Sequence, residues 1–132
     1  MDRKAQGVRS VGAIMSRLIG LGKTVLLPIG DNERYDLVID EGTKFVRMQC
    51  KTGRLVKGTL RFKAASTNLE RGKWTQRDYR GQADVFGVYC RELDKVYLVP
   101  VAEVGKREGF LRIEPTQTTK GVRWAKDFEM RA

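Results

Sequence analysis

Residues 8–21 carry apolar side chains at the spacing of an amphipathic helix. The apolar positions within this stretch are 8, 11, 14, 15, 18, 19 and 21. Residues three or four apart share one face of a helix, so these positions form a single apolar stripe. Gly20 and Gly22 favour the end of the helix at this point. The pattern therefore predicts one helix that packs a single face against a core.

Short apolar or alternating runs predict a series of strands after this helix. The expected strands cover residues 24–28, 35–40, 44–51, 60–62, 84–90, 95–101 and 110–113. Residues 30–32, 41–43 and 92–94 have the composition of turns, and residues 66–81 that of a polar, basic loop. Residues 122–130 are expected to form a short closing helix. This order of elements indicates an α+β or mixed α/β architecture.

The strand at residues 44–51 combines a buried face with a polar face. Side chains alternate between the two faces of a strand, so Val46, Met48 and Cys50 are expected in the core. The outward face then carries Phe45, Arg47, Gln49 and Lys51. If the turn at residues 41–43 closes a hairpin, Asp36 of the preceding strand lies near Gln49 and Lys51. An acid, an amide and a lysine would then meet at one end of the sheet.

Composition limits the chemistry that these side chains can perform. The 132 residues include 26 basic and 16 acidic side chains, a net charge of +10, and no histidine. The lack of histidine excludes Ser-His and Cys-His triads and zinc sites with histidine ligands. Cys50 and Cys90 lie within apolar runs and are expected to be buried free thiols. Catalysis therefore has to rest on carboxylates, amides, lysines and a hard metal ion.

The expected cluster suits the hydrolysis of a phosphodiester bond. A divalent cation shields the negative phosphate and lowers the pKa of a bound water. Mg²⁺ takes oxygen ligands, and the candidates are the Asp36 carboxylate, the Gln49 amide oxygen and the main-chain carbonyl of Cys50. Lys51 can position the attacking water or neutralise developing charge. Mn²⁺ is the expected substitute for Mg²⁺.

Three stretches resemble the PD-(D/E)XK nucleases in order, spacing and strand context: Pro28-Ile29-Gly30-Asp31, Tyr35-Asp36-Leu37-Val38-Ile39-Asp40 and Gln49-Cys50-Lys51-Thr52. Residues 97–101, 111–115 and 122–125 are also similar. The chain looks closest to the small branch that includes group I intron-encoded homing endonucleases, in which Gln replaces the usual acid. Holliday junction resolvases of the same fold are the next resemblance.

The resemblance implies both a fold and a set of site residues. The fold would be a single-domain, restriction-endonuclease-like mixed sheet over residues 1–132, with an N-terminal helix and a short C-terminal helix. Asp36 would be the metal-binding acid, Gln49 would stand at the variable acid position, and Lys51 would be the catalytic lysine. One departure is the helix, where many relatives carry a glutamate. That position falls at Val11, and the possible substitutes are Asp31, Asp40 and Glu41.

Basic side chains and aromatic rings give a second signal, for a DNA contact. Residues 44–63 contain seven basic residues and no acid, and residues 66–81 add four more basic residues with interleaved rings. Phosphates attract such donors, and rings can stack on bases. The alternative is a solvated loop with one or two rings on the core. The candidates for DNA contact are Arg47, Arg54, Lys57, Arg61, Lys63, Arg71, Lys73, Trp74, Arg77, Tyr79 and Arg80.

Two classes of function follow from these observations. The first is a metal-dependent DNA endonuclease that acts on a homing site or resolves four-way junctions in DNA recombination. Both tasks need two cuts, so a homodimer or homotetramer is expected. The second is a nuclease-like module that binds DNA without cutting it. No run approaches the roughly 18 apolar residues of a membrane span, so a cytoplasmic protein of bacterial, archaeal or phage origin with no membrane partner is expected.

Overall fold

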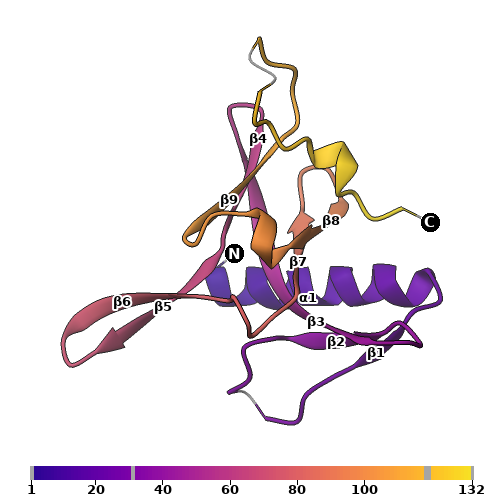
Figure 1. Ribbon diagram of the computed structural model, residues 1–132, viewed down its shortest axis with the longest axis vertical. Coiled ribbons are helices and arrows are strands. Elements are labelled where there is room, and N and C mark those ends of the chain that lie inside the picture. The colour runs from indigo at the N-terminus through magenta and orange to yellow at the C-terminus, as the bar shows by residue number, and fades with distance from the viewer. Residues whose placement is uncertain (1, 31, 118–119, 132) are drawn as a thin grey trace.

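The N-terminal helix covers one face of a sheet (Figure 1). The computed structural model describes residues 2–30, 32–117 and 120–131. Helix α1 spans Arg3–Gly20 and buries Ser10, Ile14 and Leu18. The Asp2 side chain accepts a hydrogen bond of 2.8 Å from the amide of Ala5. This cap satisfies a free amide of the first turn, which explains why the helix starts earlier than the apolar stripe predicts.

Seven strands form a mixed sheet, and two more form a separate hairpin. The bounds of the strands are β1 Thr24–Leu26, β2 Leu37–Asp40, β3 Phe45–Val56, β4 Thr59–Lys63, β5 Ala65–Glu70, β6 Lys73–Asp78, β7 Val85–Cys90, β8 Lys95–Pro100 and β9 Glu108–Arg112. The main path is β1-β2-β3-β4-β9, and β7 pairs with both β3 and β8. The expected fold class, an α+β mixed sheet with an N-terminal helix, is confirmed.

Strand β3 is the centre of the sheet and changes partners along its length. Its first part pairs antiparallel with β2, up to Leu37 opposite Met48. Its last part pairs antiparallel with β4, from Arg54 onward. On the other edge β7 runs parallel to β3 from Met48 to Gly53. Between the β2 and β4 pairings, residues 49–53 of β3 therefore have an open edge, which we call the β3 gap.

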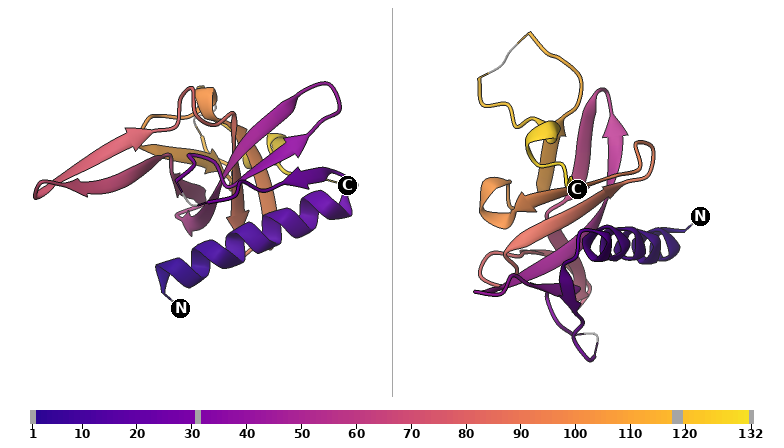
Figure 2. Two further views of the ribbon diagram at one scale, coloured as in Figure 1. Left: turned by 90° about the horizontal axis from the view of Figure 1, so that it is seen from below. Right: turned by 90° about the vertical axis from the view of Figure 1, so that its right-hand side faces the viewer.

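Residues 66–81, expected as a loop, instead form most of a β-hairpin. Strands β5 and β6 pair in register from Ala65 opposite Asp78 to Glu70 opposite Lys73. The hairpin extends away from the rest of the molecule in both views that show it side-on (Figures 1 and 2). Most of its side chains are exposed. We call β5 and β6 the arm.

The C-terminal segment is also different from the expectation. In place of a helix over residues 122–130, a single 3-10 turn covers Ala125–Asp127. The flanking residues make isolated bridges, Tyr97 with Glu129 and Arg112 with Trp124. A second 3-10 turn, η1, covers Val101–Glu103. The spacing of Val122, Ala125 and Phe128 resembles a helical stripe, but these residues follow the surface of the sheet.

Two hydrophobic clusters hold these elements together, one on each side of the sheet. The first contains Ile14 and Leu18 of α1 with Leu37, Ile39 and Met48. The second forms between β4, β7, β8 and β9. Cys50 and Cys90 are buried free thiols, as expected. No helix within the described ranges is long and apolar enough to cross a membrane.

Candidate active site

The β2–β3 hairpin brings Asp36 to the β3 gap. The Asp36 amide donates a hydrogen bond of 2.8 Å to the carbonyl of Met48. One residue beyond the last β2–β3 pair, the same register places Asp36 opposite Gln49. Asp36 Oδ2 then accepts a hydrogen bond of 2.8 Å from the amide of Cys50. The carboxylate thus occupies the place that a strand partner would otherwise fill.

The Asp36 carboxyl group is half-buried, which shifts its pKa. Burial raises the pKa of Asp36 above its ordinary value, because a charged carboxylate loses solvation there. The Cys50 amide and the positive charge of Lys51 oppose this rise and lower the pKa of Asp36. A cation beside Asp36 would strengthen that second effect. The group therefore favours a positively charged ligand.

Lys51 is held by a tyrosine that the sequence analysis assigned elsewhere. Its Nζ atom donates a hydrogen bond of 3.1 Å to the hydroxyl of Tyr79 and lies 4.8 Å from the centre of that ring. Tyr79 is only 3% exposed and packs edge-on against Phe86 at 5.6 Å. A buried ring cannot stack on a base, so the expectation that Tyr79 contacts DNA is wrong.

Arg34 ties the segment before Asp36 to the base of the arm. Its guanidinium lies 4.0 Å from the centre of the Tyr79 ring. Its nitrogens donate to the Gln82 side chain at 2.8 Å, to the Ser66 hydroxyl, and to the main-chain carbonyls of Arg77 and Asp78. The sequence analysis missed Arg34, because nothing in its local pattern shows contacts with residues so far along the chain.

The residues at the gap offer oxygen atoms of the kind that Mg²⁺ binds. Within a strand, a residue directs its N–H and C=O to the same edge. The Cys50 carbonyl therefore points to the β3 gap, as its amide does toward Asp36. The half-buried Gln49 side chain makes no hydrogen bond within the described part of the chain, so its amide oxygen is available. Asp36, Gln49 and Cys50 fit a hard cation in donor type.

The same site contains few carboxylates. Across residues 2–30, 32–117 and 120–131, no group of three or more Asp, Glu, His or Cys side chains could hold a metal ion. Asp40 accepts a hydrogen bond from the Gly42 amide at 2.8 Å, and Glu41 pairs with Lys23 at 2.9 Å. Both lie at the far end of the hairpin from Asp36, so neither substitutes for a helical acid. Asp31 lies outside the described residues.

Helix α1 approaches the gap with different side chains from those expected. Val11, the position assigned to the missing acid, packs half-buried against the core cluster of Ile14 and Met48. The helix residues that line a cavity with Cys50 and Lys51 are Arg3, Gln6 and Gly7. None of them is acidic, and α1 contains no acidic residue.

This cavity of about 420 Å³ gathers four of the basic residues expected to contact DNA. Lys51, Arg54, Arg61 and Lys63 all line it. The Arg61 guanidinium lies 5.0 Å from the Phe110 ring, and its buried Nε atom has no hydrogen-bond partner in the described residues. Lys51 also donates to Tyr79, and Arg54 pairs with Glu108 at 3.4 Å. Cationic side chains that line one cavity suit phosphate oxygens. We call this cavity the Lys51 cavity.

Of the remaining candidates for DNA contact, some are exposed and others bind groups within the protein. Arg71, Lys73, Trp74 and Arg77 are exposed on the arm, and Lys57 is exposed in the β3–β4 turn.

Two other arginines already have partners in the protein. Arg47 binds the Asp84 carboxylate at 3.1 Å and the Gly81 carbonyl, and this pairing lowers the pKa of Asp84. Arg80 donates to the Val104 carbonyl at 2.7 Å. Both therefore stabilise the fold.

Comparisons with known proteins agree with this geometry. A family model described as PD-(D/E)XK endonuclease matches residues 1–131. Among solved structures, the bacterial homing endonuclease I-Ssp6803I is similar with a TM-score of 0.78 and 25% sequence identity. The match covers 98% of this chain and 89% of that one. No curated protein sequence matches the chain.

Proposed function

Because the chain belongs to the PD-(D/E)XK endonuclease family, we propose that it is a divalent-metal-dependent endonuclease that cuts duplex DNA in the manner of a homing enzyme. The observation that carries this proposal is the meeting of Asp36 and Lys51 at the β3 gap, beside a cavity lined with basic side chains. The similarity to a bacterial homing endonuclease supports duplex DNA as the substrate.

Each group at the gap has a role in phosphodiester hydrolysis. Asp36, the Gln49 amide oxygen and the Cys50 carbonyl would hold the metal ion. A bound Mg²⁺ supplies charge neutralisation at the phosphate and a water of lowered pKa. Lys51, held by Tyr79, presents a positive charge to the phosphate under attack. Arg61 and Lys63 bind neighbouring phosphate oxygens and keep the strand in place.

The arm supplies the contact that reads the duplex. A two-stranded antiparallel ribbon fits the major groove of B-DNA. The β5–β6 register puts Asn68, Thr75 and Arg77 on one face, and Thr67, Gln76 and Trp74 on the other. Both faces carry side chains that form hydrogen bonds with base edges. Arg34 fixes the base of the arm to the Asp36 segment, so a duplex held by the arm lies next to the Lys51 cavity.

Two cuts in a duplex require two copies of the site, so the active form is a homo-oligomer. A contact surface for a second copy is the sheet face opposite α1, where Leu26 of β1 and Phe45 of β3 are exposed on the two strands that flank β2. Leu27 and Ile29, which follow β1, are also exposed. Large apolar side chains clustered on a surface are typical of contacts between subunits.

Cleavage assays with matched variants test this function. Wild-type protein is incubated with supercoiled plasmid, linear duplex and a synthetic four-way junction, with and without Mg²⁺. We expect metal-dependent nicking or cleavage of duplex DNA. Lys51→Ala should lose cleavage and bind DNA within about threefold of wild type, since Lys51 acts mainly on the transition state. Lys44→Ala removes the same charge at an exposed turn and serves as the control.

Three outcomes would change the conclusion. Cleavage by Lys51→Ala at the wild-type rate would refute the assignment of the catalytic lysine. Preferential cleavage of the junction would identify a resolvase. Tight DNA binding without cleavage under any divalent ion would identify a binding module, a function that the single carboxylate at the gap also favours.

A further inference from the structure

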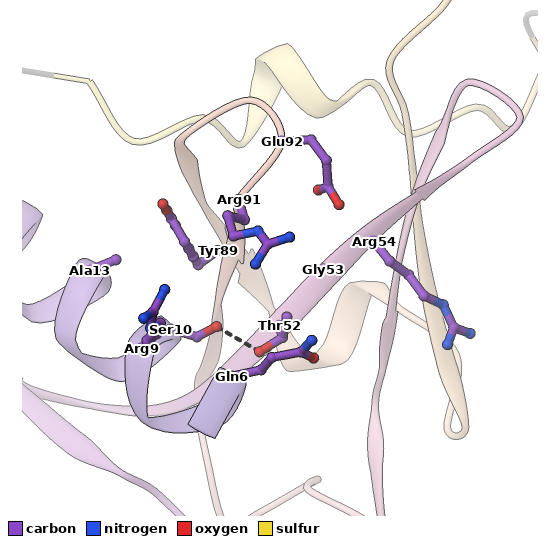
Figure 3. A pocket seen from close by; sticks show the side chains of 10 residues that line it. All are labelled: Gln6, Arg9, Ser10, Ala13, Thr52, Gly53, Arg54, Tyr89, Arg91 and Glu92. Carbon is purple, nitrogen blue, oxygen red and sulfur yellow. Dashed lines mark hydrogen bonds between the residues drawn. The ribbon is translucent and has the colours of Figure 1, made fainter. Parts of the chain in front are cut away.

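A second cavity of about 540 Å³ lies between α1, the end of β3 and the β7–β8 turn. Figure 3 shows its lining side chains. Arg9 comes from the helix, Thr52 from β3, and Arg91 from the turn. This cavity shares Gln6, Thr52 and Arg54 with the Lys51 cavity, so the two adjoin each other beside the N-terminal part of α1. We call it the Arg9–Arg91 cavity.

The wall of this cavity contains a pair of hydroxyl groups. Ser10 Oγ and Thr52 Oγ1 are 2.6 Å apart, and Ser10 is only 2% exposed. When Ser10 is the donor of this bond, the hydroxyl of the exposed Thr52 keeps its hydrogen for a ligand. The β3–β7 register sets Thr52 beside Tyr89, so the position of the pair is fixed by α1, β3 and β7 together.

Two arginines line the same cavity without partners. Arg9 and Arg91 are exposed, and neither side chain makes a hydrogen bond or ion pair within the described residues, although the main-chain carbonyl of Arg91 accepts from the Asp94 amide at 3.2 Å. The one acid that lines the cavity, Glu92, accepts a hydrogen bond from the Cys90 thiol at 3.4 Å. Arg54, by contrast, pairs with Glu108 at 3.4 Å, and its guanidinium points away from the cavity in Figure 3.

Two guanidinium groups beside a hydroxyl donor form a site for a phosphate group. Guanidinium groups bind phosphate oxygens through paired, charge-assisted hydrogen bonds. An anion would also relieve the repulsion between two like charges that share one cavity. The cavity has a volume of about 540 Å³, which is large enough for a phosphodiester group and part of the nucleotides that it joins.

We propose that the Arg9–Arg91 cavity binds a backbone phosphate of the DNA, away from the phosphate attacked beside Lys51. The proposal rests on the proposed function and extends it. Because the cavity adjoins the Lys51 cavity, a strand bound at both would pass beside the N-terminal part of α1. The enzyme then holds its substrate on both sides of the β3 gap.

Arginine footprinting tests the proposal on the whole protein. Phenylglyoxal modifies accessible guanidinium groups, and mass spectrometry gives the rate at each residue. We expect a duplex at micromolar concentration, in the absence of divalent metal, to slow modification of Arg9 and Arg91 by about fivefold or more. Arg123 is exposed in the C-terminal segment and serves as the unprotected control.

The results separate this proposal from the proposed function. If DNA is cleaved but Arg9 and Arg91 react at their free rates, the cavity proposal is wrong and the enzyme assignment stands. If inorganic phosphate or a mononucleotide protects both arginines while DNA does not, the site binds a small phosphate ligand and the DNA proposal is wrong. If no DNA is bound or cleaved, the proposed function itself fails.

Salt dependence gives a second and independent measurement. Removing one phosphate contact makes the negative slope of log K against log[salt] less steep by about 0.9. Arg9→Gln with Arg91→Gln removes one phosphate contact and should therefore make the slope for duplex binding less steep by about 0.9. The double variant Arg123→Gln with Lys126→Gln removes the same charge at exposed positions and should leave the slope unchanged. An equal slope for both double variants would contradict the proposal.

Discussion

The Nζ atom of Lys51 and the hydroxyl of Tyr79 form a hydrogen bond of 3.1 Å that joins the β3 gap to the base of the arm. Tyr79 follows β6 directly. The Arg34 guanidinium lies 4.0 Å from the centre of the Tyr79 ring and donates to main-chain carbonyls at the end of β6. Under the proposed function, this contact would set a duplex on the arm relative to the lysine. We therefore propose Tyr79 as a positioning residue for Lys51.

Tyr79→Phe should slow cleavage without weakening DNA binding. The substitution removes one hydrogen bond to a charged group, worth about 1.5–3 kcal/mol, so we expect at least about a tenfold lower rate. The ring and its packing against Phe86 remain. Single-turnover rates, DNA affinity and melting temperature are measured together.

Tyr97→Phe is the matched control, because Tyr97 is also a buried tyrosine of the core and lines neither the Lys51 cavity nor the Arg9–Arg91 cavity. It should cleave at the wild-type rate. A fall in affinity as large as the fall in rate for Tyr79→Phe would show a DNA contact and refute the positioning role.

The core of the site could be predicted from the sequence because it depends on strand alternation. The opposite faces of Gln49 and Cys50, and the return of Asp36 through a short turn, follow from a period of two and a hairpin. The buried Met48 and the half-buried Gln49 confirm this interpretation. The contacts of Arg34 and Tyr79 could not be found in this way, because they join distant segments.

The arm and the C-terminal segment were mispredicted for opposite reasons. Both faces of the arm are exposed, so its sequence lacks the apolar alternation by which a strand is recognised. Residues 122–130 do carry periodic apolar positions, but these side chains pack against two different hydrophobic clusters. Ala125 and Phe128 pack on the cluster between β4 and β9, and Met130 packs on the cluster under α1.

Asp36→Asn should leave the folded protein at least as stable as wild type at pH 7. Burial raises the pKa of Asp36 above its ordinary value of 3.8, so the folded state binds this proton more tightly than the unfolded state. The free energy of unfolding therefore falls as pH rises from 3.8 through the folded pKa. Asparagine carries no charge and keeps an oxygen for the Cys50 amide. Urea unfolding without metal, at several pH values, measures the difference.

Asp84→Asn is the contrasting variant, since the bond with Arg47 lowers the pKa of Asp84. Its stabilising effect is present above the unfolded pKa and is lost as pH falls through the folded pKa. We expect Asp84→Asn to be less stable than wild type at pH 7 and equal to it in strong acid. If Asp36→Asn showed this same pattern, the carboxylate would be a stabilising group and the prediction would be wrong.

Neutralising the arm should weaken DNA binding through its salt dependence. Arg71, Lys73 and Arg77 changed together to Gln should reduce the slope of log K against log[salt] by roughly two to three. Trp74→Ala should weaken binding with an unchanged slope, because a ring contributes stacking and no charge. Both are measured by fluorescence anisotropy on the same duplex. An unchanged slope for the triple variant would exclude the arm from the interface.

Metal binding should depend on DNA, because Asp36 is the one carboxylate that the described residues place at the gap. Asp40 and Glu41 are engaged at the far end of the hairpin, and α1 offers no acid. A phosphate of the substrate would supply the missing anionic oxygens. Calorimetry on the free protein should therefore show little Mg²⁺ binding at millimolar concentration, while the DNA in the complex is cleaved at that concentration.

Mn²⁺ should support cleavage at lower concentration than Mg²⁺, because it binds such sites more tightly. Asp36→Asn should abolish cleavage with both ions. Tight binding of Mg²⁺ by the free protein would instead show that a further acid, such as Asp31, completes the site.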